Sequence, residues 1–247
     1  MEILQNESNK RVSIMIPPGL FITGTGTDVG KTYVTSLIAR ELVSDGVTVG
    51  AYKPVCSGCE ERPNGDLIWR DIEELSKAIG GGFDPERICP QRFSAGLAPP
   101  VAARMEGKTV DATLLRRGAA WWNDKVDFLL IEGVGGLLCP LTDEESVADL
   151  AKDLEFPLLI VASLGLGTIN HTLLTVEVAQ NRGIVVAGIV LNTPCAEEAD
   201  QAAETNPREI AARCNVPVLG TVLHNQTAGL FRDGNQIKID WKAIARL

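Results

Sequence analysis

The part of this chain that most constrains its fold is a stretch near the N-terminus, residues 24–32, with the sequence GTGTDVGKT. It follows the mostly apolar residues 20–23, and residues 33–42 after it have a helical pattern. A strand, a glycine-bearing turn and a helix entered through Gly-Lys-Thr are typical of a phosphate-binding loop. In such a loop backbone N–H groups face the phosphates, Lys31 reaches the β and γ oxygens, and the Thr32 hydroxyl binds Mg²⁺.

The spacing of the two glycines departs from the usual motif. That motif has four residues between its glycines, which would put the first glycine at position 25. The residue there is Thr25, and Gly24 lies one position earlier. An ordinary glycine-rich turn is the alternative interpretation. Gly-Lys-Thr placed between a strand and a helix favours a variant phosphate-binding loop.

Length and charge narrow the classes of protein to which the chain can belong. Its 247 residues suffice for one large α/β domain with a sizeable core. We predict a mobile leader over residues 1–18 and a single domain over residues 19–247. The net charge of −9 argues against nucleic acid or an anionic membrane as the main partner. No apolar run approaches the roughly 20 residues of a membrane helix, no secretory signal is visible, and we expect a cytoplasmic protein.

The six cysteines have irregular spacing, which predicts reduced thiols and not a disulfide framework. Cys56 and Cys59 have the spacing of a metal or redox pair. No second Cys-x-x-Cys pair completes a zinc site, and both histidines, His171 and His224, lie far away in the sequence. We therefore interpret the pair as plain thiols in a loop.

Strands alternate with helices along the chain, which predicts a mostly parallel central sheet with helices on both faces, as in P-loop NTPases. Residues 83–110 are punctuated by prolines and are interpreted as an excursion that could cover a site. The expected strands are residues 20–23, 47–55, 126–131, 157–162, 185–191 and 218–223. The expected helices are residues 33–42, 71–79, 113–122, 147–154, 168–180, 207–213 and 241–247.

Polar residues follow several of the expected strands. Lys53, Glu132 and Asn192 each come at the end of a strand, and residues 163–167 form a glycine-bearing turn after another. Parallel strands place these ends at one edge, where ligands bind in open α/β sheets. Glu132 either reaches a metal held by the phosphate loop or caps the next turn. Asn192 either pairs with adenine or forms a turn. The set predicts ATP-dependent phosphoryl transfer to an acceptor that Lys53 neutralises.

Four motifs in order resemble the dethiobiotin synthetase family over about residues 20–224. They are GTGTDVGKT at residues 24–32, YKPVCSG at 52–58, EGVGG at 132–136 and LGTINH at 166–171. The resemblance implies an ATP- and Mg²⁺-dependent homodimer of biotin biosynthesis. Such an enzyme closes the ureido ring of dethiobiotin from 7,8-diaminopelargonate and CO₂ or bicarbonate. An amine captures CO₂ as a carbamate, ATP phosphorylates the carbamate, and the neighbouring amine displaces phosphate.

The resemblance also implies roles for residues at matching positions. Lys31 would stabilise the transferring γ-phosphoryl group, and Lys53 would hold the carbamate oxygens. The implied ATP-binding residues are Thr27, Asp28, Val29, Gly30, Lys31, Thr32 and Asn192. The implied substrate contacts are Thr27, Lys53, Ser57 and, from the partner subunit across the dimer interface, Asn170. The implied Mg²⁺ ligands are Thr32, Glu132 and an aspartate, for which we prefer Asp71 to Asp66 because Asp71 begins the following helix.

The nearest alternative function is a partitioning or metal-delivery ATPase, a switch of related topology. Proteins of that kind carry a signature lysine five residues before the lysine of Gly-Lys-Thr. That position is Gly26 here, so the signature lysine is absent. The dethiobiotin synthetase family usually has aspartate at the same position, which makes Gly26 the one departure from the family pattern.

Overall fold

The computed structural model describes residues 17–193, 201–224 and 229–247. An eight-stranded sheet has the strand order β12-β11-β10-β9-β8-β1-β7-β2, and its six strands from β10 to β2 are parallel. The strands of this sheet are β1 (Gly19–Gly24), β2 (Val49–Tyr52), β7 (Phe128–Gly136), β8 (Leu158–Ser163), β9 (Val186–Asn192), β10 (Val218–Val222), β11 (Leu230–Arg232) and β12 (Asn235–Ile237). The predicted mostly parallel central sheet is confirmed.

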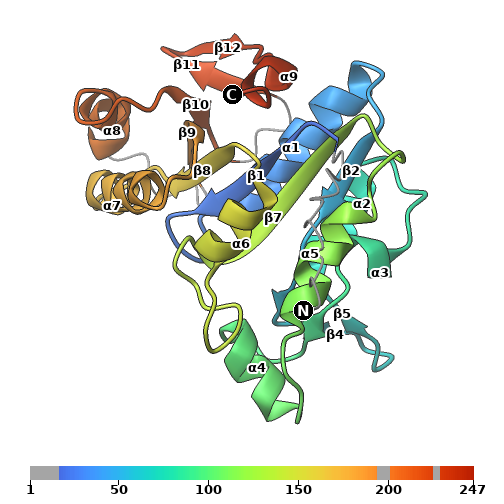
Figure 1. Cartoon of the computed structure of the whole chain (residues 1–247). Coiled ribbons are helices and arrows are strands. Elements are labelled where there is room, and N and C mark those ends of the chain that lie inside the picture. Colours follow the sequence, from blue (N-terminus) through green and yellow to red (C-terminus); the bar gives the residue numbers. More distant parts are fainter. Residues whose placement is uncertain (1–16, 194–200, 225–228) are drawn as a thin grey trace, which may run out of the picture.

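Helices cover both faces of the sheet (Figure 1). The connection from β1 to β2 runs toward one edge, and the connection from β7 to β8 runs toward the other. Because parallel crossovers are right-handed, α1 and α6 lie on opposite faces. The helices are α1 (Lys31–Ser44), α2 (Arg70–Ala78), α3 (Pro85–Ile88), α4 (Pro99–Met105), α5 (Ala112–Ala120), α6 (Val147–Leu154), α7 (Thr168–Asn181), α8 (Gln201–Ala211) and α9 (Trp241–Ile244).

The central strands form the core because both of their faces are covered. Every residue of β1 and β2 is buried, as are Phe128–Gly133 at the start of β7. Apolar runs of this kind are expected where helices pack on both sides of a parallel sheet. β2 ends at Tyr52, before the expected end at residue 55, because Pro54 has no N–H to donate to a sheet ladder. The core therefore fixes the strand ends that carry the polar residues.

Several boundaries differ from the sequence-based expectation. Glu132 was expected at the tip of its strand, but β7 continues through the following glycines as far as Gly136. The strand continues because β1 still pairs with it there, Gly24 opposite Gly136. A helix was expected to begin at Pro207, whereas α8 spans Gln201–Ala211 in the described chain and contains that proline.

Some elements were not predicted at all. β11 and β12 form an antiparallel hairpin whose turn is Asp233-Gly234, both with positive φ. Asp-Gly is a strong hairpin signal that the alternation of strands and helices obscured. The loop after β2 contains the short strands β3 (Cys56–Ser57), β4 (Glu60–Glu61) and β5 (Leu67–Ile68), and a further short strand, β6 (Arg92–Phe93), follows α3. The predicted leader falls almost wholly on residues 1–16, outside the described part of the chain.

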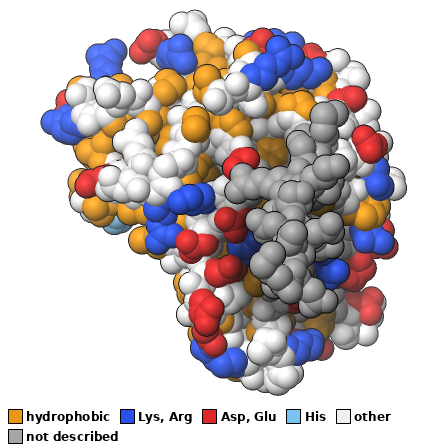
Figure 2. Space-filling view, in the orientation of Figure 1, with side chains coloured by type: hydrophobic (Ala, Val, Ile, Leu, Met, Phe, Trp, Pro, Cys, Tyr) orange, Lys and Arg blue, Asp and Glu red, His pale blue; other side chains and the backbone are white. Residues whose placement is uncertain are grey.

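Surface charge is mixed on the face drawn in Figure 2, where lysine and arginine side chains are interspersed with acidic ones. Many charged side chains of the described residues pair with each other; for example, Arg116 binds the carboxylates of Glu145 and Asp153. Among the described residues, no helix combines the length and the apolar character that a membrane span requires.

Candidate active site

A cavity of about 950 Å³ lies at the carboxyl edge of the parallel strands. Its walls come from segments far apart in the sequence: the phosphate-binding loop, residues 53–60 after β2, the first turns of α2 and the end of β7. Residues 96–99, from the proline-punctuated excursion, complete the wall. The fold thus brings the strand ends and part of that excursion to one cavity.

The phosphate-binding loop folds back on itself around Lys31. Lys31 is buried, and its Nζ donates a hydrogen bond to the carbonyl oxygen of Gly26 at 2.9 Å. Gly24 ends β1, and a Cβ on it would lie 2.7 Å from the Val29 side chain and 2.9 Å from the Gly26 oxygen. Position 24 therefore requires glycine, which explains the shifted first glycine of the motif. Burial lowers the pKa of Lys31, and the charge of Lys53 lowers it further.

Four side chains form a hydrogen-bonded cluster at the cavity: Thr32, Lys53 and Asp71 line it, and Glu132 lies buried behind them. The Glu132 carboxylate oxygen Oε1 accepts from the Thr32 hydroxyl at 2.7 Å and from Lys53 Nζ at 2.6 Å. Lys53 Nζ also lies 2.7 Å from Asp71 Oδ2. Lys53 and Glu132 are almost wholly buried, at 3% and 0% exposed, whereas Asp71 is 41% exposed. Residues from α1, α2, β7 and the end of β2 therefore meet at one point.

The opposite charges in this cluster stabilise the ionised forms of Lys53 and Asp71. Burial alone would lower the pKa of Lys53, but the carboxylates of Glu132 and Asp71 outweigh burial and hold that pKa well above its usual value. Burial alone would raise the pKa of Asp71, but Lys53 outweighs it and holds that pKa below its usual value. At neutral pH Lys53 is therefore a cation and Asp71 an anion.

The cluster fits Mg²⁺, which prefers oxygen ligands and binds through one or two carboxylates plus substrate phosphates. Thr32, Asp71 and Glu132 offer one hydroxyl and two carboxylates. Glu132 Oε2 is buried and has no hydrogen-bond partner among the described residues, so one oxygen remains for a ligand. In the described parts of the chain, no three His, Cys, Asp or Glu side chains gather as a metal site. The donor set is thus suited to Mg²⁺ bound together with a nucleotide and unsuited to a structural metal.

The structure separates the two aspartates between which the sequence could not decide. Asp71 lies in the first turn of α2 and lines the cavity. Asp66 is exposed, sits in the preceding loop and accepts a hydrogen bond from Asn64 Nδ2 at 2.7 Å. The geometry therefore favours Asp71 as the acid beside Thr32.

Thr27 and Ser57 line the cavity as well. In the sequence, Thr27 precedes Lys31 and Ser57 follows Lys53. Thr27 is exposed at the tip of the loop, and Ser57 lies in β3. Asp28 contributes to the cavity wall, whereas Val29 is 7% exposed and packs into the core. The side chain at position 29 is therefore not part of the cavity wall.

The two asparagines lie outside the cavity. Asn192, at the end of β9, is 2% exposed, and its Nδ2 donates to the Val29 carbonyl oxygen at 3.0 Å. This hydrogen bond fixes the phosphate-binding loop to the end of β9. Asn170 is exposed in the first turn of α7, the helix that follows the turn at residues 163–167. No side chain of the cavity wall comes from α7 within the described chain.

Replacing Gly30 with alanine should destabilise the protein by about 2 kcal/mol. Gly30 has φ 89°, in the left-handed region, and a Cβ on it would lie 2.0 Å from Asn192 Nδ2. The added methyl group would therefore both strain the backbone and break the hydrogen bond from Asn192 to Val29. Urea denaturation measures the change. Gly26→Ala is the matched control, because a Cβ at position 26 meets nothing within 4 Å, and it should change stability by less than about 0.5 kcal/mol. Equal effects of the two variants would contradict this account of the loop.

The cavity wall also includes residues that the sequence analysis did not single out, among them Glu74, Cys139 and Arg70. Glu74 lies three residues after Asp71 on α2, and this spacing places both on one face of a helix and could have identified it. Burial raises the pKa of the Glu74 carboxyl and of the Cys139 thiol. The sequence carries no comparable signal for Cys139.

The Cys56–Cys59 pair has the properties of plain thiols. Both cysteines are free and both line the cavity. Burial raises the pKa of Cys56 to about 11, so its thiol is protonated at neutral pH and is a weak nucleophile.

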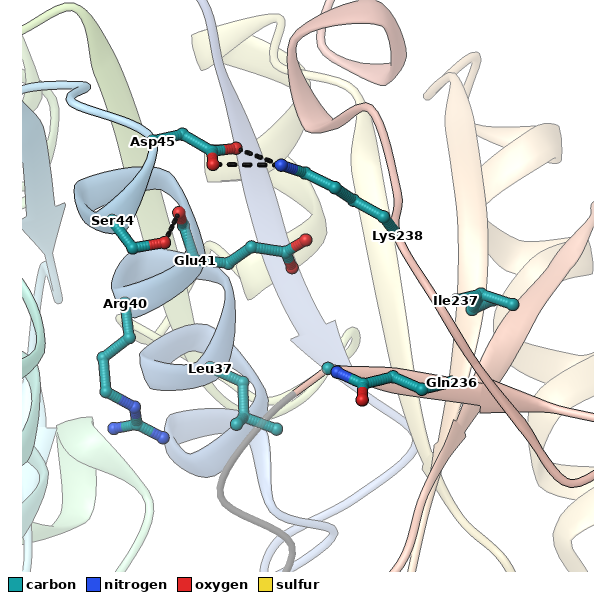
Figure 3. A pocket seen from close by; sticks show the side chains of 9 residues that line it. Leu37, Arg40, Glu41, Ser44, Asp45, Gln236, Ile237 and Lys238 are labelled. Atoms are coloured by element: carbon teal, nitrogen blue, oxygen red, sulfur yellow. Dashed lines mark hydrogen bonds and ion pairs between the residues drawn. The ribbon is translucent and has the colours of Figure 1, made fainter.

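A second cavity, of about 490 Å³, lies between the C-terminal half of α1 and β12 (Figure 3). An ion pair between Lys238 and Asp45 closes one side of it. None of the predicted site residues lines this second cavity. Its side chains are of mixed charge and mostly exposed, so the larger cavity is the candidate site.

Comparisons with known proteins show the family to which the chain belongs. A family model described as an AAA domain matches residues 18–228. An ATP-dependent dethiobiotin synthetase BioD from Rhodopirellula baltica is 39% identical over 82% of this chain and 82% of its own length. One from Anaeromyxobacter sp. (strain Fw109-5) is 45% identical over 78% of this chain and 84% of its own. A more distant likeness is the hydrogenase maturation factor HypB from Archaeoglobus fulgidus, with TM-score 0.48 and 19% identity over 84% of this chain and 81% of that one. The chain therefore belongs to the ATP-dependent dethiobiotin synthetase family.

Proposed function

We propose that this protein closes the ureido ring of dethiobiotin from 7,8-diaminopelargonate, CO₂ or bicarbonate, and ATP, in biotin biosynthesis. The observation that carries the proposal is the convergence of Lys31 and Lys53 on one cavity, with Asp71 and Glu132 beside them. A carbamate and ATP are both anions, so a site that joins them needs positively charged groups beside each of them. Two lysines from different strand ends supply them, and the names of the relatives point to the same reaction.

The reaction proceeds in three bond-forming steps. An amine nitrogen of the diamine attacks CO₂ and loses a proton, which gives a carbamate anion. A carbamate oxygen then attacks the γ-phosphorus of ATP, and ADP leaves. The second amine attacks the carbonyl carbon of the mixed anhydride, and phosphate leaves as the ring closes. No general base is needed for the phosphorylation, because the attacking oxygen is already anionic.

Each lysine serves one anion. Lys31 binds the β and γ phosphates and stabilises the charge on the γ-phosphoryl group as it transfers. Lys53 holds the carbamate oxygens beside that group, and Thr27 and Ser57 bind along the rest of the substrate. All four residues line the same cavity of about 950 Å³. Positioning the two anions in line is the main catalytic contribution of such a site.

Thr32, Asp71 and Glu132 would hold Mg²⁺. Bound there with ATP, the metal ion would neutralise charge on the β and γ phosphates. The loop backbone from Thr27 to Thr32 cradles the phosphates. Asn192 pairs with the adenine edge through its side-chain amide, which carries both donors and an acceptor.

A homodimer with a shared site explains the position of Asn170. Asn170 is exposed and lies outside the cavity of its own chain, at the N-terminus of α7. The neighbouring Leu166 is 92% exposed, and Leu174 on the same helix is 53% exposed. Apolar side chains exposed together favour burial against another subunit. Asn170 and the α7 N-terminus would then bind the substrate carboxylate in the partner's cavity.

Mixing two inactive variants tests the shared site. Asn170→Ala and Lys53→Ala subunits should each have low activity alone, whereas their hybrid dimer contains one intact site. With random mixing, about half of the dimers are hybrids and half of the hybrid sites are intact, so recovery should approach about a quarter of wild-type activity per site. No recovery after subunit exchange, with hybrid dimers verified, would contradict a shared site.

The remaining features of the proposal concern organisation and location. We propose that residues 19–247 act as one domain behind an N-terminal leader and that the enzyme works in the cytoplasm. Neither nucleic acid nor a membrane is required as a partner. The mixed charge of the surface in Figure 2 and the net charge of −9 support this.

The experiment is a product assay on the purified protein. With ATP, Mg²⁺, bicarbonate and 7,8-diaminopelargonate it should release ADP and form dethiobiotin in equal amounts. Omitting the diamine should abolish ADP release. ATP hydrolysis that is independent of the diamine, without dethiobiotin, would instead favour the partitioning or metal-delivery type of ATPase switch.

A further inference from the structure

The ammonium group of Lys53 lies directly on the two carboxylates proposed for Mg²⁺. Its Nζ is 2.6 Å from Glu132 Oε1 and 2.7 Å from Asp71 Oδ2. The side chain is 3% exposed, so water screens these contacts very little. The proposed carbamate-binding lysine and the proposed metal site therefore share their anions.

The carboxylate oxygens that are left for a divalent cation would bring it close to the Lys53 ammonium. Glu132 Oε1 already accepts hydrogen bonds from Lys53 and from the Thr32 hydroxyl. The buried Glu132 Oε2 has no partner among the described residues. A divalent cation bound through Glu132 Oε2 and Asp71 would lie on the same two carboxylates as Lys53 Nζ. Like charges held this close in a buried site repel each other strongly.

We propose that Lys53 couples the acceptor subsite to the metal subsite. While its ammonium lies on Asp71 and Glu132, Lys53 weakens the binding of a divalent cation to them. A carbamate anion that pairs with Lys53 offsets this charge and strengthens that binding. The carbamate part of this inference rests on the proposed function, whereas the antagonism between the two cations depends only on the observed contacts.

The coupling has a functional consequence. Coupling between two binding sites is reciprocal, so the metal–nucleotide complex would bind most tightly when the anionic acceptor is present. The enzyme would then bind Mg²⁺ and ATP tightly only when the carbamate is also bound. This arrangement would limit hydrolysis of ATP in the absence of the acceptor.

Binding of Mn²⁺ to the nucleotide-free protein tests the inference, with free Mn²⁺ measured by electron paramagnetic resonance. Lys53→Met removes the ammonium and leaves both carboxylates in place. It should bind Mn²⁺ about tenfold more tightly than the wild type, within the range usual for coupled sites. Lys77→Met is the matched control. Lys77 is exposed in the last turn of α2, the helix that carries Asp71, so its replacement removes an equal charge and should leave Mn²⁺ affinity within about twofold.

A second variant and a second readout separate coupling from folding effects. Lys53→Gln removes the charge but keeps a hydrogen-bond donor, and it should also bind Mn²⁺ more tightly. In thermal denaturation, Mg²⁺ should raise the Tm of both neutral variants more than it raises the wild-type Tm. A merely structural role for Lys53 predicts a lower Tm without tighter metal binding. Mn²⁺ affinities equal to or weaker than the wild-type value would overturn the inference. If the wild type made no dethiobiotin but the affinities shifted as stated, only the proposed function would fail.

Discussion

Replacing Lys53 with alanine should lower turnover by about 10²–10³-fold while ATP binding is retained. Lys53 is buried at the end of β2, where its ammonium faces the cavity beside the phosphate-binding loop. Without it, nothing at that position offsets the repulsion between a carbamate and the γ-phosphate. The loss should therefore appear in kcat, because Lys31 and the loop backbone still bind the nucleotide.

Steady-state kinetics together with equilibrium ATP binding measure the two effects separately. Lys77→Ala, which removes an exposed lysine on α2, is the matched control and should leave both values unchanged. Circular dichroism checks that the Lys53 variant is folded. Normal turnover in a folded Lys53→Ala protein would show that the carbamate role has been assigned to the wrong residue.

Replacing Glu132 with glutamine should lower the free energy of unfolding by about 3 kcal/mol. Glu132 is fully buried, and its carboxylate compensates the buried ammonium of Lys53 at 2.6 Å. Glutamine keeps the shape and an acceptor for the Thr32 hydroxyl, but it leaves Lys53 with Asp71 as its carboxylate partner. The same change should abolish Mg²⁺-dependent turnover, because one of the two proposed carboxylate ligands is gone.

Guanidinium denaturation measures the stability change, and Glu73→Gln is the control. Glu73 is on α2 and makes an ion pair with Arg62 at the surface, where both side chains are about half exposed. Exposed pairs contribute at most about 1 kcal/mol, so this control should be nearly neutral. A Glu132→Gln protein as stable as the control would mean that the buried cluster does not depend on that charge.

Much of the site could be predicted because parallel topology is a strong constraint. Once β1, β2 and β7 are adjacent and parallel, their carboxyl ends must lie at one edge. Lys53 and Glu132 therefore had to approach the phosphate-binding loop, and a sequence pattern suffices to show it. The strand assignments rest on apolar runs that are buried on both faces, which is the clearest signal that such a sheet provides.

Side-chain geometry within the cluster could not be predicted in the same way. Asp71 is reached through an irregular segment with several short strands, so spacing alone did not decide between Asp71 and Asp66. The pairing of Lys53 with both carboxylates depends on side-chain conformations that no local pattern encodes. Glu132 was expected at the end of its strand, yet the strand continues through the following glycines, and Gly136 still pairs with β1.

Position 26 illustrates how a departure from a family pattern can be interpreted physically. Its backbone carbonyl receives the Lys31 ammonium at 2.9 Å, and a Cβ there would meet nothing within 4 Å. The aspartate usual in the family would therefore fit without changing the loop. Gly26 removes a negative charge near the phosphates and leaves the geometry of the loop intact. It also leaves no side chain that could act as the signature lysine of the ATPase switches.

The central claim is that ATP phosphorylates a carbamate, and oxygen transfer tests it most directly. The enzyme is mixed rapidly with the diamine, ATP, Mg²⁺ and C¹⁸O₂, and the phosphate from a single turnover is analysed by mass spectrometry. A carbamate oxygen that attacks the γ-phosphorus leaves with phosphate when the ring closes. One ¹⁸O per phosphate, with the second ¹⁸O in the ureido carbonyl, is therefore the predicted result. Phosphate that carries only solvent oxygen would contradict the account, because water and not the carbamate would then have been the acceptor.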